Sequence, residues 1–144
     1  MAARSKSLFM DRSQLCRRFF DEGADFRNYT YAKYGRIVLQ QPGSFAWQVF
    51  DAQVKHLLRD EYKLRGATKV QADTLEALVE KMQDVHPMNF LETVREYNAA
   101  IKREVTFDPN IKDGRATRGL SIEKTNWANL IEVPPFEGYS VGCG

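Results

Sequence analysis

The sequence predicts an α+β fold in which a small mixed sheet packs against a pair of helices. Three observations point to this fold. Residues 45–50, FAWQVF, are short, aromatic and partly β-branched, as is typical of a strand. Residues 73–85 and 87–104 carry apolar side chains at helical spacing. The 144 residues, 43% of them hydrophobic, suffice for one domain with a core of its own.

The excess of basic over acidic residues in the chain lies within residues 1–36. They contain eight Lys and Arg residues against four acidic ones, whereas the remainder contains 13 basic and 15 acidic residues. Aromatic side chains are interleaved with these charges, and no apolar period of 3.6 residues runs through the segment. We therefore expect short strands and ordered loops here, with Phe9 and Met10, then Phe19 and Phe20, as strand pieces.

Two helix starts follow the predicted strand at 45–50. Asp51 is expected to end that strand and to cap a helix whose apolar stripe comprises Val54, Leu57 and Leu58. Asp73 and Glu76 have the spacing of a capping box, in which each side chain satisfies an amide at the helix start. The apolar stripe of this second helix comprises Leu75, Leu78, Val79 and Met82.

A third helix is expected to begin at Pro87, since proline is favoured in the first helical turn. His86 then belongs to the N-cap region rather than to a catalytic site. The short connection to the preceding helix predicts an antiparallel hairpin, and loops are predicted beyond Val105. The buried face of the third helix is expected to comprise Phe90 or Leu91, Val94, Tyr97 or Asn98, and Ile101.

Composition argues against several classes of protein. No run approaches the roughly 20 apolar residues of a membrane helix, so no membrane span is expected. Cys16 and Cys143 show no CxxC spacing, which favours two reduced thiols in a cytoplasmic protein, with a disulfide as the alternative. His56 and His86 stand 30 positions apart, so no metal site is expected.

The charge pattern and the glycines exclude further functions. A net charge of +2 gives no general attraction for nucleic acid, and four acids interrupt the bases of residues 4–36. Nucleic-acid binding by this segment is therefore the weakest alternative. The nine glycines form neither GxGxxG nor GxxxxGK[ST], so the sequence contains no phosphate cradle of these kinds.

The run RRFFDEGADFR, residues 17–27, is the strongest candidate for a site. Arg17, Arg18 and Arg27 are suited to a bidentate grip on carboxylates, which the nearby Glu22 and Asp25 would hold in place. The alternative is a rim of exposed salt bridges without a binding role. The composition of the run leaves both interpretations open.

Three segments carry a resemblance to a known family: RFFDEGADFRNYTYAKYG at 18–35, QPGSFAWQVFDAQV at 41–54, and the stretch from FDPNIKDGR to EGYSVGCG at 107–144. Together they resemble the FAD-dependent fumarate reductase/succinate dehydrogenase flavoprotein superfamily, and within it the tricarballylate dehydrogenase branch. LEALVEKM and LETVREYNAAIK fall where that family has its helical pair. The segments follow one another in the family's order.

The resemblance implies that residues 1–144 form a single, partial substrate-capping domain without the FAD-binding Rossmann domain. The complete family protein binds FAD and oxidises or reduces a CH–CH bond of a small di- or tricarboxylate. On its own the chain is then expected neither to bind FAD tightly nor to turn over. Its expected partners are a polycarboxylate substrate and a missing FAD-binding domain or subunit.

The same resemblance implies roles for five residues. Arg27 follows the RF…E motif one position later than usual and would exchange a proton with the substrate, oriented by Glu22 and Asp25. Arg17 and Arg18 would bind the substrate. The alternative function is a stand-alone module that keeps the cap fold and binds an anionic ligand or a protein partner.

Overall fold

A computed structural model of the chain describes residues 8–11, 15–57 and 69–142, without the side chains of residues 27–31 and 55–57. Two short 3-10 helices, Pro42–Ser44 and Ala52–Leu57, flank the second strand. The other elements are, in chain order, β1 (Leu8–Asp11), α1 (Arg27–Leu39), β2 (Phe45–Phe50), β3 (Lys69–Ala72), α2 (Leu75–Lys81), α3 (Pro87–Ala100) and β4 (Phe136–Gly142).

The four strands form one sheet in the order β1-β2-β4-β3. Each neighbouring pair is antiparallel. The predicted α+β class and the helical pair are confirmed, but the sheet described is antiparallel rather than mixed. The reason is that β4, which ends the described chain, enters between β2 and β3 and runs opposite to both of them.

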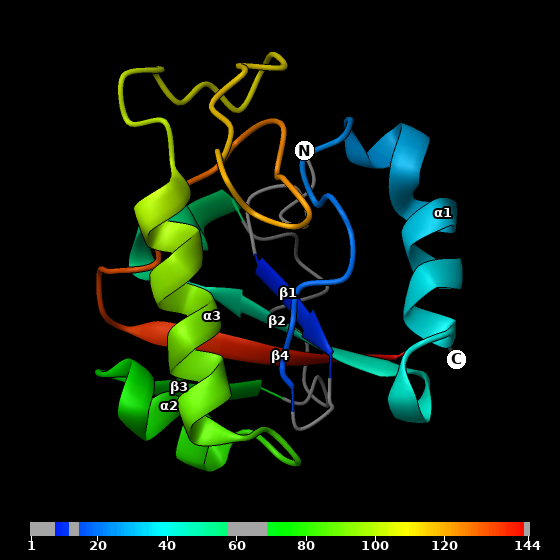
Figure 1. Ribbon diagram of the computed structural model, residues 1–144, viewed down its shortest axis with the longest axis vertical. Coiled ribbons are helices and arrows are strands. Elements are labelled where there is room, and N and C mark those ends of the chain that lie inside the picture. The colour runs from blue at the N-terminus through cyan, green and yellow to red at the C-terminus, as the bar shows by residue number, and fades with distance from the viewer. Residues whose placement is uncertain (1–7, 12–14, 58–68, 143–144) are drawn as a thin grey trace.

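Both faces of the sheet are covered by helices (Figure 1). Leu8, Met10, Trp47 and Val49 point to one face, where they pack in a single cluster with side chains of α2 and α3. The residues between them point to the other face. There, Phe9 and Ala46 pack with Tyr34 and Val38 of α1 in a second cluster, and Phe50, Val54 and Tyr139 form a third.

The predicted strand FAWQVF is confirmed as β2, and its burial on both faces explains why it lacks polar alternation. β3 and β4 were not expected from the sequence. β4 contains Gly138, a residue that weakens the strand signal. In the folded sheet a Cβ at Gly138 would lie 3.2 Å from the Val70 side chain and 3.6 Å from the Trp47 ring. The glycine therefore makes room for these side chains.

The helical pair is also confirmed. The N-cap of α2 is Thr74, whose hydroxyl accepts the Ala77 N–H at 3.0 Å, so the predicted cap at Asp73 is wrong by one residue. α3 begins at Pro87, and His86 is its N-cap, as expected. Buried side chains of the two helices are Leu78, Val79, Met82 (which follows α2), Phe90, Val94 and Tyr97, while Leu75, Leu91 and Asn98 are half-buried.

Asp51 ends β2 as predicted, and its Oδ1 accepts the Gln53 N–H at 2.9 Å. The helix that follows is a 3-10 helix rather than an α-helix. Val54 is buried. The Leu57 side chain and Leu58 lie outside the described residues.

The prediction of short strands and loops for residues 1–36 is confirmed at Phe9 and Met10, which lie in β1, and it is wrong where α1 forms. Phe19 and Phe20 lie in a loop, and a 13-residue helix begins at Arg27. This helix has weak sequence signals, because Phe26 at its N-cap makes no side-chain capping bond and its first turn has no acidic residue. It is stabilised instead by packing of Tyr34 and Val38 on the sheet.

Candidate functional site

Two loop segments that are far apart in the sequence meet at one end of the sheet (Figure 1). The first is the arginine segment, residues 16–26, which leads from β1 to α1. The second is the covering loop, residues 105–128, which lies between α3 and β4 and confirms the loops predicted beyond Val105. The predicted site residues lie in or next to the arginine segment.

Asp21 binds the covering loop through both of its carboxylate oxygens. Oδ2 accepts the Thr125 hydroxyl at 2.7 Å, and Oδ1 accepts the N–H groups of Thr125 at 3.1 Å and Gly23 at 2.9 Å. The Gly23 carbonyl accepts the Asn126 side-chain amide at 2.8 Å. A Cβ at Gly23 would lie within 3.0 Å of the Asn126 backbone, so the two backbones approach closely only because residue 23 is a glycine.

Arg18 and Glu22 form a buried ion pair at the centre of the arginine segment. Arg18 Nε donates to Glu22 Oε2 at 3.0 Å, and Nη2 donates to Glu22 Oε1 and to the Phe20 carbonyl. Nη1 donates to the Ile122 carbonyl at 2.5 Å. Glu22 Oε2 also accepts the Phe9 N–H at 3.0 Å. The pair thus connects β1, the arginine segment and the covering loop.

The surroundings of this pair are crowded and charged. The Arg18 guanidinium lies 5.7 Å from the centre of the Tyr97 ring, and the buried Lys124 ammonium lies 6.0 Å from it. Burial lowers the pKa of Arg18, but the charge of Glu22 and its hydrogen bond outweigh that effect, and the net pKa is raised. Burial raises the pKa of Tyr97 as well. Arg18 is therefore a permanent cation and Tyr97 a neutral phenol.

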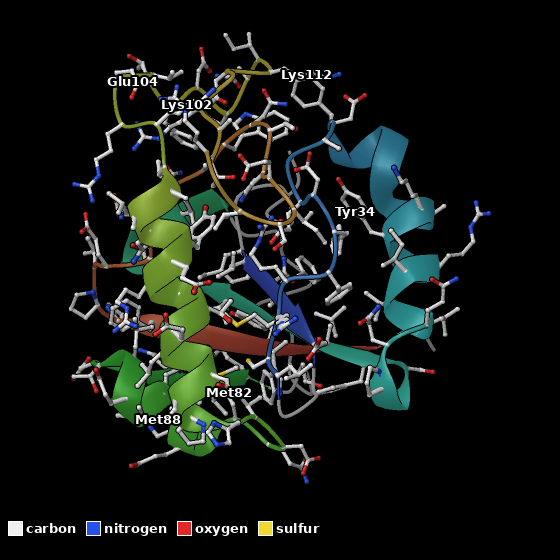
Figure 2. All side chains as sticks on the ribbon, in the orientation of Figure 1. Tyr34, Met82, Met88, Lys102, Glu104 and Lys112 are labelled. Atoms are coloured by element: carbon white, nitrogen blue, oxygen red, sulfur yellow. The ribbon has the colours of Figure 1, made fainter. Side chains whose placement is uncertain are left out.

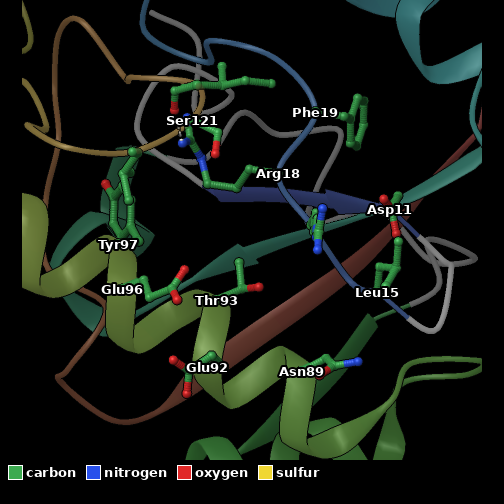
Figure 3. Close-up of a pocket in the computed structure, with 13 residues that line it drawn as sticks. Asp11, Leu15, Arg18, Phe19, Asn89, Glu92, Thr93, Glu96, Tyr97 and Ser121 are labelled. Carbon is green, nitrogen blue, oxygen red and sulfur yellow. Dashed lines mark hydrogen bonds between the residues drawn. The ribbon is translucent and has the colours of Figure 1, made fainter.

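A groove of about 670 Å³ lies between the arginine segment and α3 (Figure 3). Arg17 and Arg18 line it together with Asp11 from β1 and Glu92 and Glu96 from α3. Arg18 already directs four of its five N–H groups at acceptors within the chain. The groove therefore mixes charges of both signs, and Arg17 is its exposed cation. Substrate binding by these two arginines stays a prediction.

Asp25 lies at the other end of the arginine segment. Its Oδ1 accepts the Phe26 N–H at 2.8 Å, and its Oδ2 pairs with Lys112 Nζ at 3.1 Å. The Phe26 hydrogen bond, with a smaller contribution from Lys112, holds the pKa of Asp25 below its usual value. Figure 2 shows Lys112 in the covering loop, on the side of the start of α1. Asp25 is thus an anchor for the backbone just before Arg27.

Arg27 is the first residue of α1, and its side chain lies outside the described part of the structure. The structure places Arg17 and Arg18 along the groove, with Glu22 buried and bound to Arg18, and it places Asp25 directly before the helix. The proton-transfer role of Arg27 and the orienting roles of Glu22 and Asp25 remain predictions. The described bonds of Glu22 are those to Arg18 and Phe9.

Sequence reasoning missed the residues that hold the arginine segment, namely Asp21, Gly23, Thr125 and Asn126. Asp21 and Thr125 are 104 positions apart, and no local pattern links them. Gly23 was a weak signal, because glycine is the residue that permits a close backbone approach.

The described residues do not fit FAD. The sheet is antiparallel among its described strands, so it lacks the strand–turn–helix unit of parallel sheets on which a dinucleotide pyrophosphate binds. Within the described ranges no group of three or more His, Cys, Asp and Glu side chains is placed to hold a metal ion. Nor does any helix described here have the length and apolar character needed to cross a bilayer.

No protein-family model matches the chain, and no curated protein matches it. Among solved structures, the open conformation of a flavocytochrome c3 fumarate reductase covers 96% of the chain with a TM-score of 0.67 and 20% identity. A 3-ketosteroid delta1-dehydrogenase from Sterolibacterium denitrificans, solved with 1,4-androstadiene-3,17-dione, covers 99% of the chain with a TM-score of 0.58 and 20% identity.

The chain spans 21% of the fumarate reductase and 28% of the ketosteroid dehydrogenase. It therefore shares the fold of one part of two larger proteins. The resemblance of the sequence to fumarate reductase-type proteins is confirmed at the level of the fold. The finer likeness to a tricarballylate dehydrogenase stays a prediction.

Proposed function

We propose that the chain is the substrate-capping part of an FAD-dependent oxidoreductase of the fumarate reductase type. The observation that carries this proposal is the likeness of almost the whole chain to about a fifth of a flavocytochrome c3 fumarate reductase. Because the described residues do not fit FAD, the flavin would belong to another part of the protein or to another subunit. The chain alone would then not turn over substrate.

The substrate class is a small di- or tricarboxylate, of which tricarballylate is the example closest to the sequence resemblance. Arg27, at the first turn of α1, would bind a substrate carboxylate and give or take a proton at a neighbouring carbon. An arginine has a pKa above about 12, so this transfer needs a closed and dry pocket. A capping domain is suited to forming such a pocket. A cytoplasmic location is proposed from the two cysteines, which lie far apart in the sequence without CxxC spacing.

Nuclear magnetic resonance titration of the isolated chain with tricarballylate tests this function. We expect shifts of the amides of residues 23–27 and a dissociation constant of about 1 mM, equivalent to about 4 kcal/mol, because the chain provides only one wall of the site. Arg27→Gln should weaken binding about tenfold and reduce the shifts accordingly, whereas Arg103→Gln, which alters an exposed arginine, should leave both unchanged.

Three outcomes would contradict the proposal. The first is a wild-type chain that binds tricarballylate no better than the monocarboxylate propionate. The second is equal loss of binding in both arginine variants, which would indicate general charge attraction. The third is a stoichiometric flavin absorbance band in the purified chain. Submicromolar binding by the isolated chain would favour the alternative of a stand-alone module for anions.

A further inference from the structure

We propose that Thr125 and Asn126 are positioning residues that set the location of Arg27 through the arginine segment. This inference rests on the proposed function of Arg27 and names the part of the fold that controls it. The start of α1 is not fixed by its own capping, because Phe26 makes no side-chain capping bond. Its location must therefore come from contacts with other segments.

Besides the ion pair of Asp25 with Lys112, those contacts come from three consecutive residues of the covering loop. The hydroxyl and N–H of Thr125 bind the Asp21 carboxylate, and the Asn126 side-chain amide binds the Gly23 carbonyl. The Trp127 ring lies 5.2 Å from the Phe26 ring, with an angle of 52° between the planes. The backbone that precedes Arg27 is thus held at both ends.

The covering loop is itself rigidly held at this point. Trp127 is fully buried, and its indole N–H donates to the carbonyls of Asp108 at 2.9 Å and Ile111 at 2.8 Å. Its backbone N–H donates to Asp113 Oδ1 at 2.9 Å. Thr125 and Asn126, which donate the hydrogen bonds to Asp21 and Gly23, therefore adjoin a residue that is held by several hydrogen bonds.

α1 is attached to the same segment from its other side. The Tyr34 hydroxyl donates to the Asp21 carbonyl at 2.7 Å, and the Tyr34 ring lies 4.4 Å from that of Phe20. Asp21 consequently joins the covering loop to the helix that begins with Arg27. A shift of Asp21 would move the first turn of α1, and displacements of about 1 Å can cost up to 100-fold in catalysis.

The role of the Thr125 hydroxyl can be tested without disturbing the core. Thr125 is exposed, so removal of its hydroxyl opens no core cavity. Thr125→Val removes the hydroxyl at nearly constant volume, Thr125→Ser keeps it, and Thr106→Val makes the same change at another exposed threonine. We expect Thr125→Val to weaken tricarballylate binding about fivefold, the effect of one hydrogen bond. Thr125→Ser should bind within about twofold of wild type, and Thr106→Val should bind as wild type does.

A second readout separates positioning from overall stability and from the proposed function. The ¹⁵N resonance of Arg27 Nε should move in Thr125→Val, return in Thr125→Ser and stay in place in Thr106→Val, with or without ligand. An Arg27 resonance that is the same in all four proteins would overturn the positioning role, even if tricarballylate binds. If the Arg27 resonance moves in Thr125→Val but the wild-type chain does not bind tricarballylate, the positioning role is supported and the proposed function is contradicted.

The double variant completes the test. The weak residual binding of tricarballylate by Arg27→Gln can be measured at high ligand concentration. If Thr125 acts through Arg27, adding Thr125→Val to this variant causes no further loss of binding. An equal loss in both backgrounds would show that Thr125 contributes to binding independently, and the positioning role would be wrong.

Discussion

The sheet with its helical pair and the covering loop are stabilised in different ways. The core between the sheet and α2 and α3 is apolar, with side chains such as Trp47, Leu78 and Phe90 almost fully buried. In the covering loop, charged side chains bind backbone groups. Asp113 accepts three backbone N–H groups, and the Arg115 guanidinium donates to two carbonyls.

This contrast explains how a loop without regular secondary structure can support a binding site. Apolar burial is nondirectional, so a core accepts several side chains of similar volume. A carboxylate that binds backbone N–H groups sets the position of those groups to within a hydrogen-bond length. The covering loop can therefore place the arginine segment accurately without regular secondary structure. Changes in the two regions should have different consequences.

The largest expected effect is in the core. Phe90→Ala should lower the free energy of unfolding by about 3–5 kcal/mol, because Phe90 is fully buried between α3 and the sheet. Urea unfolding followed by circular dichroism measures this loss. The control Met88→Ala, at a side chain that is 70% exposed, should stay within about 0.5 kcal/mol of wild type. A small effect at Phe90 would contradict the distinction between the two regions.

An intermediate effect is expected where the two loop segments meet. Gly23→Ala should cost about 1–3 kcal/mol, because the new methyl group would collide with the Asn126 backbone, which cannot move as a flexible side chain does. It should also shift the Asn126 side-chain amide signals. Gly142→Ala is the matched control, since its Cβ would meet only the Ser44 carbonyl at 3.8 Å. Equal stability of the two variants would show that the loops are not tightly docked.

The smallest expected effect concerns Cys16, where the arginine segment enters the apolar core. Burial, with a contribution from Asp11, raises the pKa of Cys16 to about 12 from the usual 9.0. A raised thiol pKa means that the unfolded chain loses its proton first, so stability is full below about pH 9 and declines as the pH rises towards 12.

The decline attributable to Cys16 should be about 1 kcal/mol at pH 10. Urea unfolding at pH 8 and pH 10 should therefore show a larger loss for the wild type than for Cys16→Ala, since other titrating groups are common to both. Identical losses in the two proteins would indicate that Cys16 is less buried than the structure shows.

Local patterns predicted the elements whose stabilisation is local or purely apolar. β2 has a continuous aromatic run, and α2 and α3 have periodic stripes with recognisable starts at Thr74, one residue from the prediction, and Pro87. α1 and β4 were not predicted, because α1 lacks a side-chain capping bond at its start and β4 contains Gly138, whose role is evident only beside Val70 and Trp47. The candidate site was predictable as an arginine motif, but its attachment to Thr125 and Asn126 was not.

The α+β class, the helical pair and the arginine segment could be recognised in the amino-acid sequence, because each depends on residues close together in the chain. Three features depend on the folded arrangement: β4 lies inside the sheet, Arg18 is bound to Glu22, and Asp21 joins α1 to the covering loop. These are contacts between atoms brought together by folding, and chain spacing gives no sign of which donors will meet which acceptors.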